Sequence, residues 1–410
     1  MKYCLIGEKL SHSYSAEIHK RLGIDYSLKE IPQGKLKDFI KSCDYDGFNV
    51  TIPYKKVIMP FLSEIKEEAL KIGAVNTVLK KDGKLIGYNT DILGFELSLK
   101  KRGVSLKDKN VLILGSGGAA AVARYAAEKQ NAKTVIGVSR SGKINYDNVY
   151  ELKDTQVIIN ATPVGTFPDI FKTPVIPENF PCLEFAFDMI YNPLKTEFLC
   201  RAESVGAKIS SGLYMLTVQA IKAEEIWGKT LSENTKTDVY SWLYRLKSNL
   251  TLIGMPSCGK TTLGKILAEK LNKTFVDTDE KIYKETGKTP ETIINEQGEA
   301  AFRNIESAII KKTSELKGLI IATGGGAVTR EENINALKKN GIICYVKRDL
   351  SLLSEEYRPI SKNKGAAALF AERNPLYEKY CDFSADNNGD ILSAAKEIVK
   401  EYENTCNKRA

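Results

Sequence analysis

The sequence predicts an α/β protein of more than one domain, and three observations support this class. Two predicted strands each run into a glycine-rich turn and then a helix, first at residues 110–129 and again at 249–271. Such a unit is the start of a parallel β-α-β arrangement. The chain has 410 residues, of which 43% are hydrophobic and 27% charged. This length and composition are typical of two or three soluble globular domains.

Composition argues against several kinds of site. The eight cysteines form no C-x-x-C pair, which favours reduced thiols over a disulfide or zinc framework. The chain has two histidines, which are too few for a multi-histidine metal site and argue against a histidine-based catalytic triad. The net charge of +9 is spread along the chain, which favours attraction of small anions over nucleic-acid binding.

No apolar run is long enough to cross a bilayer, and the N-terminus enters a strand directly, so we expect neither a membrane span nor a signal peptide. We therefore expect a cytoplasmic protein whose partners are small-molecule substrates, without nucleic acid or membrane. Whether it is a monomer or a homo-oligomer is left open by the sequence.

Polar side chains follow the predicted strands of the first hundred residues, where loops usually display binding groups. Strands are indicated at residues 2–7 and 45–55, and a helix at 17–21. By itself a pair of serines before a helix is typical of an N-cap, and a lone lysine is usually a solvated surface charge. The polar positions in question are Ser13, Ser15, Asn49, Thr51, Lys55, Asn76 and Asp91.

Residues 110–129 predict a dinucleotide-binding unit, because a strand, a glycine-rich turn and an alanine-rich helix follow one another. The spacing of the turn, G-x-G-G-A, departs from the common G-x-G-x-x-G. The next predicted strand, 134–139, ends at Arg140 with Lys143 close behind and no acidic residue. This pattern favours the 2′-phosphate of NADP over the free ribose of NAD. The turn consists of Gly115, Ser116, Gly117, Gly118 and Ala119.

Together these segments resemble the shikimate dehydrogenase family. The resemblance rests on Ser13-x-Ser15, on residues 49–55 (NVTIPYK), on Ala74-Val-Asn76-Thr and on Asn89-Thr-Asp91, in the family's order and at similar spacings. It implies a catalytic lysine at Lys55 and places Met189 and Gly212 at the nicotinamide of NADP(H). It also implies that 3-dehydroshikimate, a small cyclic polyol acid, is bound by Ser13, Ser15, Thr51, Asn76, Asp91, Tyr191 and Gln219.

The chemistry of a Lys55–Asp91 pair can be argued without the resemblance. An adjacent carboxylate favours the ammonium form of a lysine. An ammonium group can donate a proton to a carbonyl oxygen as hydride arrives at the ketone carbon. The pair therefore predicts catalysis mainly in the direction of reduction.

The strongest chemical signal is the segment 254–262, GMPSCGKTT, which lies between an apolar strand and a helix. It has the P-loop pattern G-x-x-x-x-G-K-[ST]. In such a loop, backbone N–H groups and a helix N-terminus bind phosphates, Lys260 adds a catalytic cation, and Thr261 holds Mg²⁺. We therefore expect ATP contacts from Gly254, Ser257, Cys258, Gly259, Lys260, Thr261 and Thr262.

The motifs after the P-loop indicate a small anionic acceptor. A strand is predicted over 274–279, and alternation along it would place Asp277 and Asp279 on one side, where they suit a divalent cation or a hydroxyl. Arg303 follows on a predicted helix, and a triple-glycine loop, 324–326, follows a further strand. Arg358 and Arg373 bracket a mobile-looking segment, 361–371.

This second set of motifs resembles the shikimate kinase family from residue 249 to 399. The resemblance implies that Arg303 and Arg373 clamp the substrate carboxylate and that Asp279 orients or deprotonates the acceptor hydroxyl. It further implies a backbone contact from Gly325, a contact of Arg358 with the transferring phosphate, and a magnesium site at Thr261 and Asp277. Two departures from the family are a shorter lid at 362–368 and the lack of an arginine in 385–389.

The two resemblances imply consecutive reactions: NADPH-dependent reduction of 3-dehydroshikimate to shikimate, then ATP- and Mg²⁺-dependent phosphorylation of the shikimate 3-hydroxyl. The predicted domains are a discontinuous α/β substrate domain (1–101 with 213–247), a Rossmann-type NADP domain (102–212) and a P-loop domain like the NMP kinases, with a parallel sheet (248–410). Alternatives are a dehydrogenase that prefers quinate and NAD, a kinase for another small carboxylate, and one inactive regulatory half.

Overall fold

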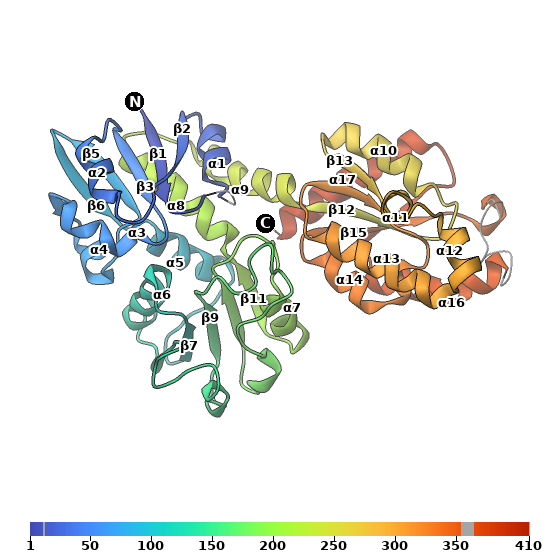
Figure 1. Ribbon diagram of the computed structural model, residues 1–410, viewed down its shortest axis with the longest axis horizontal. Helices are drawn as coiled ribbons and strands as arrows, with labels where there is room; N and C mark the ends of the chain where they lie inside the picture. Colours follow the sequence, from blue (N-terminus) through green and yellow to red (C-terminus); the bar gives the residue numbers. More distant parts are fainter. Residues whose placement is uncertain (11–12, 354–364, 410) are drawn as a thin grey trace. The chain divides into compact units, whose positions relative to one another are not determined.

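The chain forms two compact units in a computed structural model that describes residues 1–10, 13–353 and 365–409 (Figure 1). The first unit is Met1–Leu243 and the second is Tyr244–Ala410. Their boundary falls within α9 (Glu233–Lys247). Each unit is an α/β structure, as predicted.

The first unit begins with a six-stranded sheet in the order β2-β1-β3-β5-β6-β4. β1 is parallel to β2 and β3, whereas β5 is antiparallel to β3 and β6. The strands are β1 (Tyr3–Gly7), β2 (Tyr26–Glu30), β3 (Gly47–Val50), β4 (Glu64–Ile65), β5 (Thr77–Lys81) and β6 (Lys84–Tyr88). The helices are α1 (Ser15–Arg21), α2 (Leu36–Lys41), α3 (Tyr54–Val57), η1 (Met59–Phe61), α4 (Glu67–Ile72) and α5 (Asp91–Lys101).

Alternation along β3 explains why this sheet carries polar groups on a buried face. Phe48 and Val50 belong to the apolar core on one side of the sheet. Asn49 lies between them and therefore points to the other side. Asn49 is buried on that side too, with 4% of its surface exposed. Its amide therefore needs hydrogen-bond partners inside the protein.

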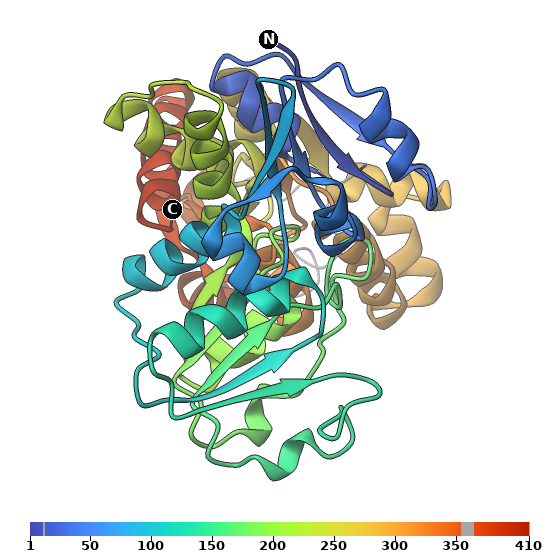
Figure 2. The ribbon, with the colours of Figure 1, turned by 90° about the vertical axis from the view of Figure 1, so that its left-hand side faces the viewer.

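The second sheet of the first unit has five parallel strands in the order β11-β10-β9-β7-β8 (Figure 2). Ligands of such sheets bind beyond the carboxyl ends of the strands. The strands are β7 (Asn110–Leu114), β8 (Thr134–Val138), β9 (Val157–Asn160), β10 (Phe185–Asp188) and β11 (Lys208–Ser211). The helices are α6 (Gly118–Lys129), η2 (Val149–Glu151), η3 (Pro177–Asn179) and α7 (Glu197–Ser204).

The chain returns to the first sheet after it has completed the second. α8 (Gly212–Ile226) packs against α5 and also contacts α1. Trp227, directly after α8, stacks on Tyr3 of β1 with ring centroids 4.5 Å apart, and its Nε1 donates to the carbonyl oxygen of Val78 at 3.0 Å. The stacking of Trp227 on Tyr3 joins residues more than 200 positions apart in the sequence into one core.

The second unit contains five parallel strands in the order β13-β14-β12-β15-β16. All five residues of β12 are buried, as is typical of a central parallel strand. The strands are β12 (Asn249–Ile253), β13 (Thr274–Asp277), β14 (Leu319–Ala322), β15 (Gly341–Lys347) and β16 (Phe383–Asp386). The helices are α10 (Lys260–Leu271), α11 (Thr278–Thr286), α12 (Pro290–Gln297), α13 (Glu299–Ser314), η4 (Ala327–Thr329), α14 (Glu331–Lys338), η5 (Leu350–Leu352), α16 (Ala366–Tyr380) and α17 (Ile391–Arg409).

One expectation about local structure is wrong. The strand predicted over 274–279 ends at Asp277, because the Asp277 carboxylate accepts from the backbone N–H of Asp279 at 2.9 Å and thereby caps α11. Asp279 therefore lies in the first turn of a helix, and strand alternation does not relate the two carboxylates. Residues 366–371 of the segment expected to be mobile form the first turns of α16.

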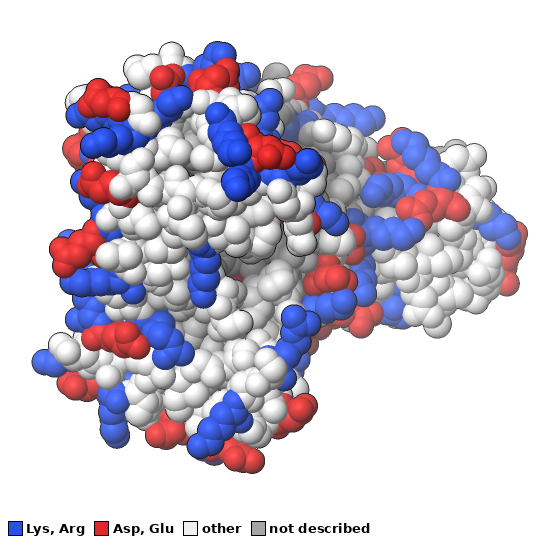
Figure 3. Space-filling view, turned by 60° about the vertical axis from the view of Figure 1, so that its left-hand side comes forward, with Lys and Arg blue, Asp and Glu red and all other residues white. Residues whose placement is uncertain are grey.

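Charged side chains are dispersed over the surface of the protein that Figure 3 draws. Over the face drawn in Figure 3, acidic and basic side chains are interspersed and neither sign forms a continuous patch. In the described ranges, no helix combines the length and apolar character needed to cross a membrane.

Candidate active sites

A cavity of about 230 Å³ in the first unit is lined by residues of the first sheet and its loops, of α6, of the loop after β10 and of α8. Residues more than 200 positions apart line it, so only the tertiary structure brings them together. The predicted site residues that line it are Ser13, Ser15, Thr51, Lys55, Asn76, Asp91, Ala119, Met189, Tyr191, Gly212 and Gln219. Every residue that the sequence assigned to the substrate is in this set.

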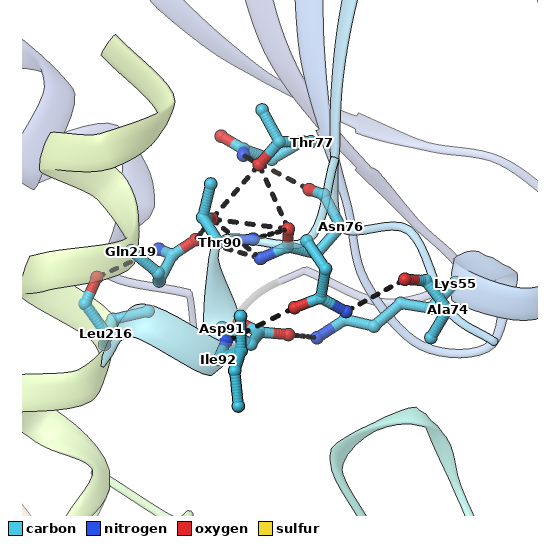
Figure 4. Close-up of polar contacts among 11 residues, drawn as sticks. Lys55, Ala74, Asn76, Thr77, Thr90, Asp91, Ile92, Leu216 and Gln219 are labelled. Carbon is cyan, nitrogen blue, oxygen red and sulfur yellow. Dashed lines mark hydrogen bonds and ion pairs between the residues drawn. The ribbon is translucent and has the colours of Figure 1, made fainter. Parts of the chain in front are cut away.

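Lys55 and Asp91 form an ion pair at the wall of this cavity (Figure 4). The Lys55 Nζ donates to the Asp91 Oδ2 at 2.6 Å, and both side chains are largely buried. Lys55 lies in α3, directly after the turn at Pro53, and Asp91 is the first residue of α5. A carboxylate at a helix N-terminus is stabilised by the helix dipole, so Asp91 can hold the ammonium group in one position.

A network of side-chain amides and hydroxyls lies beside this pair (Figure 4). The Asn76 Oδ1 accepts from the Thr90 N–H at 2.7 Å and from the Thr77 hydroxyl at 3.1 Å. Its Nδ2 donates to the Thr90 hydroxyl at 3.0 Å and to the Gln219 Oε1 at 3.4 Å. Because the oxygen of Asn76 is engaged by the protein, its amide orientation is defined, and the NH₂ group faces Gln219 of α8.

Beside this network lies a second, buried set of polar groups, of which the sequence had singled out only Asn49. The Tyr26 hydroxyl donates to the Asn49 Oδ1 at 2.7 Å, and the Asn49 Nδ2 donates to the Thr77 Oγ1 at 2.9 Å. His19 stacks on Tyr26 at 3.9 Å between ring centroids, and its Nδ1 lies 2.8 Å from the Glu224 Oε1. Burial lowers the pKa of His19, although Glu224 acts in the opposite direction.

The sequence contained one indication of this second set, but the partner residues lie far from it in the chain. Asn49 interrupts an apolar strand, and a buried amide needs partners. Its partners come from β2 and β5, which no spacing rule connects to β3.

The loop after β10 brings Met189 and Tyr191 to the cavity. A Cβ on Gly212 would lie 2.2 Å from the Met189 carbonyl oxygen, so only glycine allows this approach at the start of α8. Tyr191 packs against Tyr14 with ring centroids 5.0 Å apart. Burial raises the pKa of Tyr191 to about 12, and a hydrogen bond with Ser13 opposes this shift.

Asp188 fixes the base of this loop. Its carboxylate accepts from the Thr196 hydroxyl at 2.6 Å, the Ile190 N–H at 3.0 Å and the Asn160 Nδ2 at 3.1 Å. It therefore links the ends of β9 and β10 to the start of α7. Complete burial nevertheless raises the pKa of Asp188 to about 7, because the three hydrogen bonds only partly offset the loss of solvation.

The glycine-rich turn opens at the start of α6 and could hold the pyrophosphate of a dinucleotide. Ser116 and Gly117 are exposed, and a Cβ on Gly117 would meet nothing within 4 Å, so the backbone is accessible to a ligand. A Cβ on Gly118 would lie 3.3 Å from the Lys55 side chain. The turn is thus adjacent to the Lys55–Asp91 pair, as hydride transfer to a bound substrate requires.

Arg140 and Lys143 follow β8, the strand beside β7, and both are exposed. These cations fit a 2′-phosphate at the end of the strand. The open turn and the two cations together fit NADP(H).

In the second unit, the P-loop runs from β12 to α10 with a backbone that requires its glycines. Gly254 and Gly259 have φ values of 146° and 95°, which side chains other than glycine rarely adopt. The Lys260 Nζ donates to the carbonyl oxygens of Gly254 at 2.9 Å and Met255 at 2.8 Å. The lysine is therefore held by two carbonyl oxygens of its own loop. Ser257, Cys258, Thr261 and Thr262 belong to the same loop and the start of α10.

Thr261 and Asp277 meet at the side of the P-loop. The Thr261 hydroxyl donates to the Asp277 Oδ2 at 2.7 Å, so two oxygen ligands already lie together. Mg²⁺ in nucleotide sites is typically held by one or two such oxygens together with phosphates and water. The donor set therefore fits Mg²⁺ bound with ATP.

The predicted acceptor residues converge on the loop after β14. A Cβ on Gly326 would lie 2.0 Å from the Arg303 Nη2, and one on Gly324 would lie 3.1 Å from the Asp279 Oδ1. The Gly325 carbonyl oxygen accepts from the Tyr377 hydroxyl at 2.5 Å. Arg373, one turn before Tyr377 on α16, is 3% exposed. Arg358 lies outside the described residues.

Glu306 is the acceptor-site residue that sequence reasoning missed. Its Oε2 accepts from the Arg303 Nη1 at 2.7 Å, and its side chain is completely buried. Burial raises the pKa of Glu306; Arg303 opposes the rise, and the nearby Asp279 adds to it. The i, i+3 spacing of Arg303 and Glu306 on a helix was the available signal.

The two units define a class of protein: an oxidoreductase with a dinucleotide-binding fold and a buried lysine–aspartate pair, followed in the same chain by a P-loop kinase fold. The chain belongs to the shikimate dehydrogenase family, and its second unit is a shikimate kinase domain. Residues 5–78 match the model of the shikimate dehydrogenase substrate binding domain, and residues 256–404 match that of shikimate kinase.

Relatives and solved structures agree for the first unit. The shikimate dehydrogenase (NADP(+)) of Caldicellulosiruptor bescii is 42% identical over 259 residues, which is 55% of this chain and 88% of that protein. A chorismate mutase/shikimate 5-dehydrogenase fusion protein from Clostridium acetobutylicum is 41% identical with a TM-score of 0.55, covering 59% of this chain and 96% of that one. The shikimate 5-dehydrogenase from Thermus thermophilus, solved with NADP(H) and shikimate, is 30% identical with a TM-score of 0.53, covering 58% and 98%.

Proposed function

We propose that this chain is a bifunctional enzyme that reduces 3-dehydroshikimate to shikimate with NADPH and then phosphorylates the shikimate 3-hydroxyl with ATP. The observation that carries the proposal is the presence, in one chain, of the Lys55–Asp91 cavity and of a P-loop unit of the shikimate kinase family. The product of the first reaction is the acceptor of the second, so the two activities form one sequence of steps.

In the dehydrogenase site, Lys55 donates the proton that the carbonyl oxygen gains on reduction, and Asp91 holds the lysine in place. Ser13, Ser15 and Thr51 bind substrate hydroxyl and carboxylate groups through their own hydroxyls. Asn76, Tyr191 and Gln219 complete the substrate site. The glycine-rich turn would hold NADPH, Arg140 and Lys143 would bind its 2′-phosphate, and Met189 and Gly212 would contact its nicotinamide; the cofactor would supply the hydride.

In the kinase site, Arg303 and Arg373 bind the carboxylate of shikimate, and Gly325 contacts the ring through its backbone. Asp279 orients the acceptor hydroxyl and accepts its proton. Lys260 must leave the carbonyls that hold it in order to reach the phosphates. Thr261 and Asp277 would hold Mg²⁺, which neutralises phosphate charge when it is bound with ATP, and Arg358 is proposed to contact the transferring phosphate.

The test is one incubation of the purified chain with 3-dehydroshikimate, NADPH, ATP and Mg²⁺, with matched omissions of ATP and of NADPH and with products identified by mass. We expect shikimate 3-phosphate only in the complete mixture and shikimate alone when ATP is omitted. Shikimate without phosphate in the complete mixture would refute the kinase half of the proposal. No product in any mixture would refute the dehydrogenase half.

A further inference from the structure

We infer that Arg348 is a nucleotide-binding residue of the second unit, which donates hydrogen bonds to the α- and β-phosphate oxygens of ATP from the side of the P-loop opposite the acceptor. The inference rests on the proposed function only in requiring that the P-loop bind an adenine nucleotide. It does not depend on which acceptor is phosphorylated.

The order of the strands places Arg348 on that side. It directly follows β15, which is parallel to β12, the strand that leads into the P-loop. On the other side of β12 lie β14 and β13, whose carboxyl ends carry the Gly324–Gly326 loop and Asp277. Ligands of parallel sheets bind beyond the carboxyl ends of the strands. A nucleotide at the P-loop would therefore have the residues proposed to bind shikimate and Mg²⁺ on one side and Arg348 on the other.

The guanidinium group lies beside the phosphate-binding backbone. A Cβ on Gly259 would be 3.9 Å from the Arg348 Nη1. Gly259 is the N-cap of α10, and a helix N-terminus in a P-loop is where phosphates bind. Asn387 supports the same backbone, because its Nδ2 donates to the Cys258 carbonyl oxygen at 2.8 Å.

No described group of the protein holds this guanidinium. The Arg348 Nε is buried and has no hydrogen-bond partner among the described residues. Lys260 and Arg303 differ in this respect, since Lys260 donates to two carbonyls and Arg303 is paired with Glu306. The Nε of Arg373, at the acceptor site, likewise has no partner among the described residues. A buried polar nitrogen without an acceptor is costly, and phosphate oxygens would remove that cost.

The carboxylate of Asp386, on the adjacent strand β16, is already hydrogen-bonded to another residue. The Asp386 carboxylate accepts from the N–H and the side-chain amide of Asn388 at 2.8 and 3.0 Å. The adjoining segment 385–389 contains no lysine or arginine. Arg348 therefore supplies positive charge on a side of the nucleotide site where the segment 385–389 supplies none, and its planar, multi-donor group suits phosphate.

The test is calorimetric titration of the full chain with Mg-ADP, comparing wild type with Arg348→Met and Arg348→Lys. Loss of a charge-assisted hydrogen bond predicts about tenfold weaker binding for Arg348→Met. Arg348→Lys keeps the charge but loses the planar set of donors, so its affinity for Mg-ADP should lie between those of wild type and Arg348→Met. The Michaelis constant for ATP should rise by the same factor while that for shikimate stays unchanged.

The matched control is Lys347→Met, which removes the adjacent cation. The Lys347 Nζ lies 3.7 Å from Glu378 and is not near Gly259, so Mg-ADP affinity should be unchanged. Dehydrogenase activity of each preparation checks that the chain is folded. Unchanged Mg-ADP affinity in Arg348→Met, or an equal loss in the Lys347→Met control, would overturn the inference. Failure of the proposed kinase function would look different, since wild type would bind Mg-ADP yet transfer no phosphate to shikimate.

Discussion

Lys55 illustrates how a common surface residue becomes a catalytic candidate through its neighbours. Its ammonium group is held 2.6 Å from Asp91 at the wall of the cavity. Lys56, the next residue, is exposed. Substituting each lysine in turn therefore tests whether the position of Lys55 beside Asp91, and not merely its charge, is needed for activity.

We expect Lys55→Met to lower the dehydrogenase kcat by about 10²- to 10⁴-fold, the contribution typical of a general acid. Phosphorylation of added shikimate should be unaffected. The measurement is NADPH oxidation and ADP release on the same preparation. Lys56→Met is the control and should retain both activities; equal losses in the two variants would count against a proton-donor role for Lys55.

Glu306 holds Arg303 from the buried side of α13, whereas Glu299 contacts the same guanidinium from an exposed position at 3.1 Å. We expect Glu306→Gln to raise the Michaelis constant for shikimate by about tenfold, because a charged hydrogen bond to the arginine is lost. Glu299→Gln should have a much smaller effect, since exposed pairs contribute little. Steady-state kinetics at saturating ATP would decide; similar effects of the two substitutions would contradict the positioning role.

Arg140 is the candidate for recognition of the 2′-phosphate. We expect Arg140→Ala to raise the Michaelis constant for NADPH about tenfold or more and to leave that for NADH nearly unchanged, because only NADPH loses a charge-assisted contact. The ratio of kcat/KM for the two cofactors is the measurement. If the variant still prefers NADPH over NADH, another group of the protein must bind the 2′-phosphate.

At the scale of an element, the loop after β10 depends on one buried carboxylate. The pKa of Asp188 is raised from 3.8 to about 7, so the folded state binds its proton more tightly than the unfolded state does. The stability contributed by this protonation is fully present below about pH 4 and is lost as the pH rises to about 7.

We therefore expect Asp188→Asn, which cannot ionise, to become more stable relative to wild type as the pH rises. Its side-chain oxygen can still accept from Ile190 and Asn160 while its NH₂ donates to Thr196. The free energy of unfolding of the first unit, measured in urea at about pH 5 and about pH 7.5, tests the sign. A wild-type-to-variant difference that does not change with pH would exclude ionisation of Asp188 as the cause.

At the scale of the whole molecule, the chain divides into two units with separate cores and separate sites. A ligand that binds only the folded form of one unit stabilises that unit, by about 2.7 kcal/mol at a concentration of about 100 times its Kd. The two sites should therefore report on the two units independently.

Calorimetric unfolding should show two transitions, of which NADPH raises the midpoint of one and Mg-ADP that of the other. Lys260→Ala should abolish the shift by Mg-ADP and leave the shift by NADPH intact. A single transition moved by both ligands would show that the two units unfold as one cooperative body.

Local motifs allowed much of this molecule to be predicted. The P-loop and the strands and helices around both glycine-rich turns follow from contiguous residues, because backbone freedom at glycine and apolar periodicity act within one short segment. The prediction failed at Asp279, where a side-chain cap on α11 ended the strand two residues early.

By itself the sequence determined the α/β class, the two glycine-rich turns and most of the polar residues that line the cavity. Only the tertiary structure decided that Asn49 is supported by Tyr26, that Glu306 holds Arg303, that Arg348 lies beside Gly259, and that Asp188 keeps its proton to about pH 7. The physical reason is that burial, desolvation and the supply of hydrogen-bond partners depend on segments far apart in the chain.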